Sequence, residues 1–405
     1  MSRNLKSRLR RIRDTGKSGE FSGGHDRREG SSASERSDTS DTGSSRSDPF
    51  RFDGSSWPDW SEAGFKTLKR EISRELSIPL PQAFPGALAI LVPDLARAGR
   101  IPSHDELFFF DLETTGLSGG AGTVAFLAAF GRFAAPGEAP GKAGGGNAAL
   151  TITQYLLLDY PGEADFIEKA AMEFDPLKGS GALPIVVSYN GKSFDSQILK
   201  NRCLMNGIPV PDYFQADLLH PSRRLWKRIL PDCSQATVEV SVLGLDRAGD
   251  VSGALAPEIW FSFLKSGNNR ELVSVCDHNV RDILGLASLF LALGEIAAAP
   301  LESRKKFRFD EEAMALSWRK AVKKSPFFFE SGERKAAEIL LKSAAESGYP
   351  RAAVAAAIDA EWRFKDPTLA LKYTNAALAN PEISGNLRQE LEKRRSRLEG
   401  KTGLN

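Results

Sequence analysis

Residues 108–116 read Phe-Phe-Phe-Asp-Leu-Glu-Thr-Thr-Gly, and this stretch decides the predicted fold. The apolar run from Leu107 to Phe110 predicts a buried β-strand that ends at Asp111. Because strand side chains alternate between faces, Asp111 and Glu113 project to the same side. Two acids at the end of a buried strand are costly unless a partner such as Mg²⁺ compensates their charge. The alternative is a solvated strand end, which fits poorly with three phenylalanines directly before the pair.

The segments around this strand predict an α/β fold. Further strands are expected at Val124–Phe133, Thr151–Leu158 and Ile185–Ser188. Helices are expected at Glu163–Phe174, from Ser193 to about Met205, and over roughly Pro221–Leu230, Gln235–Leu243, Pro257–Leu264 and Arg270–Ala297. Three strands followed by alternating strands and helices favour a mixed sheet with helices on its faces. Ahead of this region, the pattern over Phe65–Leu76 predicts a short amphipathic helix.

The composition divides the chain into four segments. The composition of residues 1–48 predicts a disordered tail. Its first 17 residues hold seven basic side chains, a pattern that suits either a nucleic-acid-attracting arm or a solvated tail. Residues 49–103 form a lead-in segment, and residues 104–300 form the α/β domain. Residues 301–405 are Ala-rich and helical, with helices expected at 336–347, 352–364 and 367–379. This last pattern fits one or two tetratricopeptide-like repeats or a plain helical bundle.

The charge and cysteine content exclude several classes of protein. Lys and Arg number 54 against 52 Asp and Glu, so the net charge of +2 excludes a globally basic nucleic-acid coat but not a local basic patch. Three cysteines without a Cys-x-x-Cys pair argue against a disulfide framework or a Cys-based zinc site. No stretch reaches the roughly 18 consecutive apolar residues of a membrane span, and the basic N-terminus lacks an apolar segment. We therefore expect a cytoplasmic protein.

Two further segments carry candidate acids. Asp195 lies near the start of a predicted helix, where an acid commonly interacts with the helix dipole. His278 and Asp282 lie four residues apart on another predicted helix and share a face, a spacing that by itself usually marks a local contact. Together with Asp-x-Glu on the first strand, these segments form a much more specific pattern than any one of them alone.

This pattern resembles the DEDD group of 3′–5′ exonucleases, which have the ribonuclease H-like fold. Asp111 and Glu113 match the first motif of the group, Asp195 the second and Asp282 the third. The resemblance implies that these four carboxylates hold two metal ions, Mg²⁺ or Mn²⁺, for phosphodiester hydrolysis. It also implies that His278 orients or deprotonates the attacking water. The chain departs from the group in one place, because this histidine has the spacing to Asp282 that is usual for the tyrosine branch.

More of the chain is similar to the YprB-type ribonuclease H-like proteins, a bacterial subfamily that often carries a helical repeat tail. The blocks that carry this similarity are Gly116–Thr123, Asp217–Trp226, Glu239, Leu243–Arg247 and Asp250–Gly253. They extend the match over about residues 107–297. The similarity implies a metal-dependent nuclease fold and supplies no substrate.

Residues next to the motif acids are candidates for binding nucleic acid. Thr114, Gly116 and Leu117 open a Gly-rich stretch whose backbone N–H groups can approach a terminal nucleotide, and the alternative is a flexible turn. Asn190 and Lys192 precede the second-motif acid and are placed to reach a phosphate, although a turn role suits Asn190 equally well.

A basic face provides another candidate contact. Arg223 and Arg224 lie on a predicted helix with Trp226 among its basic residues. The charges suit phosphates and the indole suits base stacking. The alternative is a solvated amphipathic helix whose tryptophan lies in the core.

These features favour a metal-dependent 3′–5′ exonuclease that acts on a single-stranded or frayed 3′ end of nucleic acid. The first alternative is a catalytically weak or inactive nucleic-acid-binding protein on the same fold, because the third motif is altered. The second alternative is a scaffold that recruits a protein partner through its C-terminal helices.

Overall fold

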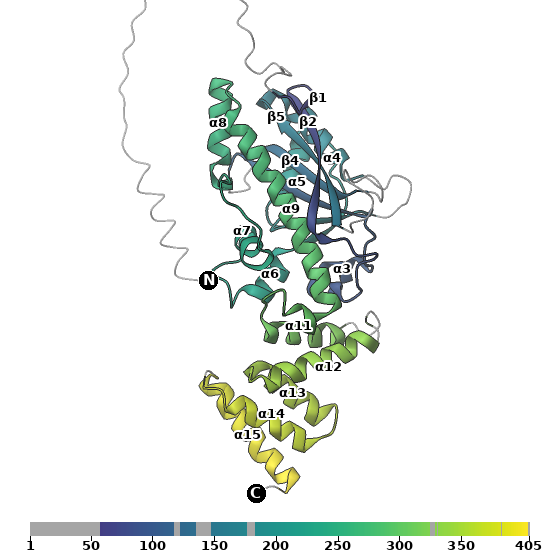
Figure 1. Cartoon of the computed structure of the whole chain (residues 1–405), viewed down its shortest axis with the longest axis vertical. Coiled ribbons are helices and arrows are strands. Elements are labelled where there is room, and N and C mark those ends of the chain that lie inside the picture. Colours follow the sequence, from purple (N-terminus) through teal and green to yellow (C-terminus); the bar gives the residue numbers. More distant parts are fainter. Residues whose placement is uncertain are drawn as a thin grey trace, which may run out of the picture. The chain divides into compact units, whose positions relative to one another are not determined.

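The protein is described from a computed structural model of the chain, which covers residues 57–116, 122–134, 147–175, 183–324, 329, 331–381 and 383–403 (Figure 1). The expectations for the tail at 1–48 and for Leu117 lie outside these residues. From Asp48 to Asn405 the chain is one compact unit.

A seven-stranded mixed sheet lies at the centre of the fold. In spatial order its strands are β1 (Ser61–Gly64), β2 (Thr67–Pro79), β5 (Asn147–Leu157), β4 (Ala125–Phe133), β3 (Leu107–Thr114), β6 (Ile185–Ser188) and β7 (Phe214–Asp217). The pairs from β1 to β3 are antiparallel, whereas β6 and β7 run parallel to β3. The predicted mixed sheet and its four predicted strands are confirmed. The short edge strand β7 was not predicted.

The helix predicted over residues 65–76 is wrong, because this segment is strand β2. It pairs with β5 from Thr67 opposite Leu157 to Glu75 opposite Ala149. Leu68, Ile72 and Leu76 recur every four residues, a spacing that fits both one face of a strand and one face of a helix. Pairing with β5 decides between the two, and β1 and β2 are therefore strands of the same sheet as β3.

Strand β3 separates two apolar cores. Phe108 and Phe110 are fully buried on the face that also holds apolar residues of helices α4 (Glu163–Met172) and α5 (Asp195–Met205). Phe109 faces the other core, with its ring centroid 6.0 Å from that of Phe290 on helix α9 (Arg270–Ala298). By alternation, Asp111 and Glu113 lie on the α9 side of the sheet, as predicted.

Helix α9 crosses the sheet in Figure 1 and packs closely on β4. The approach is closest at Gly131 of β4, where a Cβ atom would lie 2.5 Å from Cγ2 of Ile283 and 2.9 Å from Cδ2 of Leu150. A side chain at this position would therefore push the helix away from the sheet. Because Ile283 follows directly after Asp282, this contact also sets the depth of the third-motif acid.

Shorter helices connect these elements. They are α2 (Leu88–Leu91), α3 (Pro93–Ala98), η1 (Tyr160–Gly162), α6 (Leu219–Trp226), α7 (Gln235–Val238), the π-helical turn η2 (Glu239–Leu243), η3 (Gly253–Leu255), α8 (Ala256–Ser266) and α10 (Pro300–Ser303). In the part of the chain that the structure describes, no helix combines the length and the apolar character that crossing a membrane requires.

The C-terminal region is helical, as predicted. Its helices are α11 (Glu311–Lys324), α12 (Ser331–Glu346), α13 (Pro350–Trp362), α14 (Pro367–Leu378) and α15 (Gly385–Thr402). The region is tied to α6, because the Arg228 guanidinium donates to Oδ1 of Asp310 at 2.6 Å and to Oε2 of Glu312 at 2.7 Å. The tetratricopeptide-like assignment and the boundary at residue 300 stay predictions.

The close packing at Gly131 can be tested with Gly131→Ala. The added methyl group overpacks the contact with Ile283 and Leu150, so we expect a loss of about 1–3 kcal/mol in the free energy of unfolding, measured by urea denaturation. Gly294→Ala on α9 is the control, because a Cβ there meets nothing within 4 Å. We expect the control to be neutral or stabilising, and equal losses in both variants would contradict the packing argument.

Candidate metal centre

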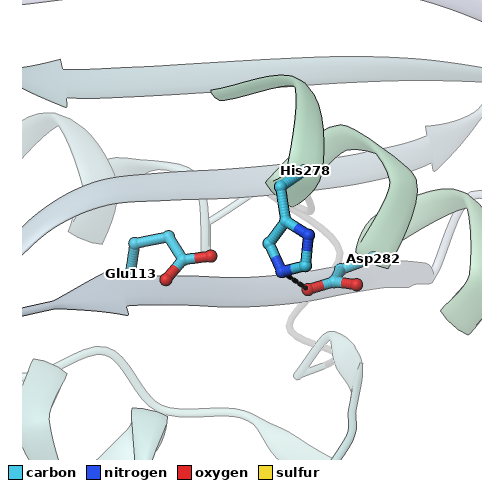
Figure 2. A group of neighbouring side chains, drawn as sticks. All are labelled: Glu113, His278 and Asp282. Carbon is cyan, nitrogen blue, oxygen red and sulfur yellow. Dashed lines mark ion pairs between the residues drawn. The ribbon is translucent and has the colours of Figure 1, made fainter. Parts of the chain in front are cut away.

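Three side chains from β3 and α9 gather at the carboxyl end of β3. Glu113, His278 and Asp282 each offer a ligand atom, and these atoms lie within 4.8 Å of one another. Figure 2 shows Glu113 projecting from the strand toward His278 and Asp282, which lie one turn apart on the helix. The predicted shared face of His278 and Asp282 is therefore observed, with Nε2 of His278 3.2 Å from Oδ2 of Asp282.

Two of the acids are buried without a balancing partner. Glu113 is 8% exposed, and Asp195, the first residue of α5, is 5% exposed. Among the residues that the structure describes, neither carboxylate forms an ion pair or accepts a hydrogen bond from another side chain. Burying an unpaired carboxylate is costly, so such groups become neutral or bind a cation.

Electrostatic repulsion places Asp111 and Glu113 within range of each other, of Asp195 and of Asp282. Burial, followed by the charges of Asp282, Asp195 and Glu113, holds the pKa of Asp111 well above its ordinary value. Burial, followed by the charges of Asp282, Asp195 and Asp250, does the same to the pKa of Glu113. Burial also raises the pKa of Asp195 to about 7. Buried oxygen donors that repel one another are a donor set that fits hard divalent cations.

A buried chain of hydrogen bonds holds Asp111 in place. Nδ2 of Asn279 donates to Oδ2 of Asp111 at 2.7 Å, and Nε2 of Gln154 donates to Oδ1 of Asn279 at 2.7 Å. Nε of Arg70 in turn donates to Oε1 of Gln154 at 2.6 Å. We call Arg70, Gln154 and Asn279 the buried relay; it connects β2, β5 and α9 to the first-motif acid. The sequence analysis missed it, because its members come from three distant segments and only Asn279 lies inside a motif.

A second set of contacts holds Asp282 and His278. Nη2 of Arg247 donates to Oδ1 of Asp282 at 2.6 Å, and Nε of Arg247 donates to Oε2 of Glu239 at 2.7 Å. Nη1 of Arg247 donates to Oδ2 of Asp250 at 3.0 Å, and Oδ1 of Asp250 lies 3.0 Å from Nδ1 of His278. Glu239, Arg247 and Asp250 belong to the blocks that carried the resemblance, where they had no assigned role. In the structure they surround the third motif.

The residues that follow Glu113 form a turn. Oγ1 of Thr114 donates to the carbonyl oxygen of Gly116 at 3.0 Å, so this hydroxyl is engaged with the chain itself. Both residues lie at the end of β3 next to the acid cluster, where a nucleotide contact stays a prediction.

Asn190 and Lys192 follow the carboxyl end of β6, at the same end of the sheet as the acids, and both contact acids of the protein. Their backbone N–H groups donate to the carboxylate of Asp217 at 2.9 Å and 3.2 Å. Asn190 has a positive φ of 63°, which suits the turn role considered for it. The Lys192 ammonium lies 2.5 Å from Oδ2 of Asp94, so its charge is paired within the protein.

The predicted basic face is partly engaged with the protein itself. Trp226 is fully buried and donates from Nε1 to the carbonyl oxygen of Arg308 at 2.8 Å, so the core alternative is confirmed for its indole. Nη1 of Arg224 donates to the carbonyl oxygens of Ile90 and Leu91 at 3.1 Å and 3.3 Å. Arg223 is exposed and remains a candidate for binding phosphate.

Comparison with known proteins agrees with the fold. Residues 108–293 match the model of the RNase_H superfamily. The chain is also 35% identical over 196 residues to the "Uncharacterized protein YprB" of Bacillus subtilis (strain 168), which covers 48% of this chain and 43% of that protein. The match thus spans less than half of the relative's length. The similarity to YprB confirms the resemblance to that protein, and the match to the family model confirms a ribonuclease H-like domain of nuclease type at residues 108–293.

The raised pKa values predict how stability depends on pH. A carboxyl group whose pKa is raised in the folded state holds its proton more tightly there than in the unfolded chain. Its contribution is therefore present at low pH and is lost as the pH rises through the folded pKa, which is about 7 for Asp195. In EDTA we expect the melting temperature to fall between pH 5 and pH 8. Adding Mn²⁺ should offset more of the loss at pH 8 than at pH 5, because the cation replaces the protons.

Asp195→Asn is the matched variant for this measurement. It removes one buried charge and little volume, so we expect a flatter pH dependence in EDTA and less stabilisation by Mn²⁺. Exposed Glu168→Gln on α4 is the control and should behave like the unmodified protein. A melting temperature that rises from pH 5 to pH 8 in EDTA would contradict a cluster of raised pKa values.

The hydrogen bond from the buried relay to Asp111 can be measured with a double-mutant cycle. Asn279→Ala leaves the Gln154 amide and the Asp111 carboxylate short of partners, so we expect a loss of about 1–3 kcal/mol in the free energy of unfolding. In an Asp111→Asn background the same change should cost about 1 kcal/mol less, because the charge-assisted bond is already gone. Strict additivity of the two substitutions would show that the bond contributes nothing.

Proposed function

We propose that this protein is a metal-dependent 3′–5′ exonuclease that hydrolyses phosphodiester bonds of nucleic acid. The observation that carries the proposal is the cluster of Glu113, His278 and Asp282, whose ligand atoms lie within 4.8 Å of one another at the carboxyl end of β3 in a ribonuclease H-like sheet. The match of residues 108–293 to the RNase_H superfamily and the similarity to YprB support it. Substrate, polarity and the number of ions are parts of the same proposal.

In this proposal the four carboxylates hold two divalent cations, Mg²⁺ or Mn²⁺. Bound there, the cations supply a Lewis acid and a template for the attacking water and the leaving oxygen. Asn279 fixes one oxygen of Asp111, so that the other is available as a ligand atom. The acids must lose protons before they bind a cation, and their raised pKa values set the pH range in which they do so.

His278 is the residue proposed to orient the attacking water or to accept its proton. Its ring lies between two carboxylates, with Nδ1 3.0 Å from Asp250 and Nε2 3.2 Å from Asp282. Both carboxylates lie next to a ring nitrogen, and one of these nitrogens would accept the proton of the water. The ring is also close to Glu113, which belongs to the same group of three side chains as His278 and Asp282.

Nucleic-acid binding without hydrolysis is a second candidate function, and one contact favours it. Arg247 donates to Oδ1 of Asp282, while Oδ2 of Asp282 faces His278. A cation that used this carboxylate would compete with a guanidinium that is already in place. If the guanidinium keeps this carboxylate and the cation cannot bind, the site binds nucleic acid but does not hydrolyse the phosphodiester.

A nuclease assay with Asp111→Asn tests the primary proposal. Oligonucleotides of DNA and RNA labelled at the 5′ end would be incubated with Mg²⁺, Mn²⁺ or EDTA and resolved by size. We expect a ladder of products shortened from the 3′ end with either metal, none in EDTA, and no products with Asp111→Asn, because the variant lacks a charged ligand.

Glu168→Gln is again the control and should retain full activity. A blocked 3′ end should prevent degradation by the unmodified protein. Undiminished hydrolysis by Asp111→Asn would overturn the assignment of the site. Binding of the oligonucleotides without hydrolysis in Mn²⁺ would favour the second candidate.

A further inference from the structure

A groove of about 620 Å³ lies between α3 and α11, and its lining is partly apolar. Its lining includes Ile90, Ala96 and Leu316, together with charged side chains from α3, α6 and α11. We call it the α3–α11 groove. It joins the lead-in segment to the first helix of the C-terminal region, and the site analysis above does not use it.

Every ionisable side chain that lines the α3–α11 groove is a cation; these residues are Arg97, Arg224, Lys320 and Lys324. Lys320 and Lys324 are exposed and, among the residues that the structure describes, form no ion pair. Their four-residue spacing places both on one face of α11. Arg224 donates to backbone carbonyl oxygens, so no carboxylate cancels its charge directly. Arg97 alone is paired, with Asp94 at 3.0 Å.

A second groove in the helical region differs because carboxylates form part of its lining. There, Asp359 accepts from Arg319 at 2.6 Å and from Lys323 at 2.7 Å, and Glu338 lies 2.5 Å from Arg363. The lining of this second groove holds six Lys and Arg side chains against these two acids, so it is also positive. Of the two grooves, only the α3–α11 groove has no carboxylate in its lining.

Helix α3, which lines the groove, is fixed at the end of the sheet that carries the acids. The N–H of Asp217 at the end of β7 donates to Oδ2 of Asp94, in the first turn of α3, at 3.3 Å. Lys192, three residues before Asp195, contacts the same carboxylate. Strand β7 lies two strands from β3, which is roughly 10 Å at ordinary strand spacing. These contacts link α3 to the end of the sheet where Asp195 lies.

We propose that the α3–α11 groove binds the backbone of single-stranded nucleic acid, so that α11 forms part of the substrate-binding surface. This inference rests on the proposed nuclease function. The cations of the lining suit phosphates and its apolar side chains suit unpaired bases, which is the combination that binds single strands without sequence preference. An acidic peptide has the same sign of charge as nucleic acid. Because α3 is fixed at the same end of the sheet as the proposed phosphodiester-hydrolysing site, nucleic acid is the better match for the groove.

The test measures binding of the full chain to fluorescent single-stranded oligonucleotides of DNA and of RNA by anisotropy. Measurements in EDTA exclude hydrolysis, so binding is read independently of activity. For the double variant Lys320→Ala/Lys324→Ala we expect about tenfold weaker binding and a shallower salt dependence, by about one to two in the slope of log K against log salt. The matched control is Lys335→Ala/Lys342→Ala, which removes two exposed lysines from α12 that line the second groove.

The outcomes separate this inference from the proposed function. Weaker oligonucleotide binding by Lys320→Ala/Lys324→Ala, with unchanged binding by Lys335→Ala/Lys342→Ala and equal melting temperatures, supports binding in the α3–α11 groove. This conclusion holds even if the protein never hydrolyses the strand. Equal binding by the two pairs overturns the groove, and it does so even if the nuclease assay succeeds. The inference is also overturned if polyglutamate binds as tightly as the oligonucleotides and this binding requires Lys320 and Lys324. The partner of the groove is then an acidic protein.

Discussion

Four carboxylates crowded at one end of the sheet, two of them buried, determine how the surrounding elements must pack. Strand β3 and helices α5 and α9 bring these four side chains to the carboxyl end of β3. Repulsion and burial raise the pKa values of Asp111 and Glu113 well above the ordinary range. The folded chain therefore pays a cost at this edge, and the apolar packing on both faces of β3 must exceed it. That tension is what makes the cluster a site for cations instead of an ordinary part of the core.

Two sets of polar contacts let the sheet hold such a cluster. The buried relay keeps Asp111 oriented through neutral amides and one distant arginine, without cancelling its charge directly. On the other side, Arg247 bonds directly to Asp282 and to two further acids. Asp111 is thus oriented but still has an oxygen available to bind a cation, whereas the charge of Asp282 is already partly neutralised by Arg247. This difference is the structural reason for comparing hydrolysis of nucleic acid with binding alone.

The segments outside the core domain also contribute to the chemistry at this edge. Strand β2 carries Arg70 of the buried relay, and α3 carries Asp94, which anchors Lys192 beside the second-motif acid. Helix α11 supplies two unpaired lysines to the α3–α11 groove. The lead-in segment is therefore connected to the acids through Arg70 and Asp94, and in the proposal above α11 adds a binding surface for nucleic acid.

Local sequence patterns were enough to predict the mixed α/β fold and the face that Asp111 and Glu113 share, because alternation along a strand and spacing along a helix are local properties. Asp195 and Asp282 were assigned through the resemblance to the DEDD group, and their role as metal ligands stays a prediction. The sequence misassigned β2, since a four-residue apolar spacing fits a helix and a strand equally and only pairing with β5 distinguishes them. It could not reveal the buried relay or the bond from Arg247 to Asp282. Those contacts join residues that are distant in the chain, and only tertiary packing sets their distances.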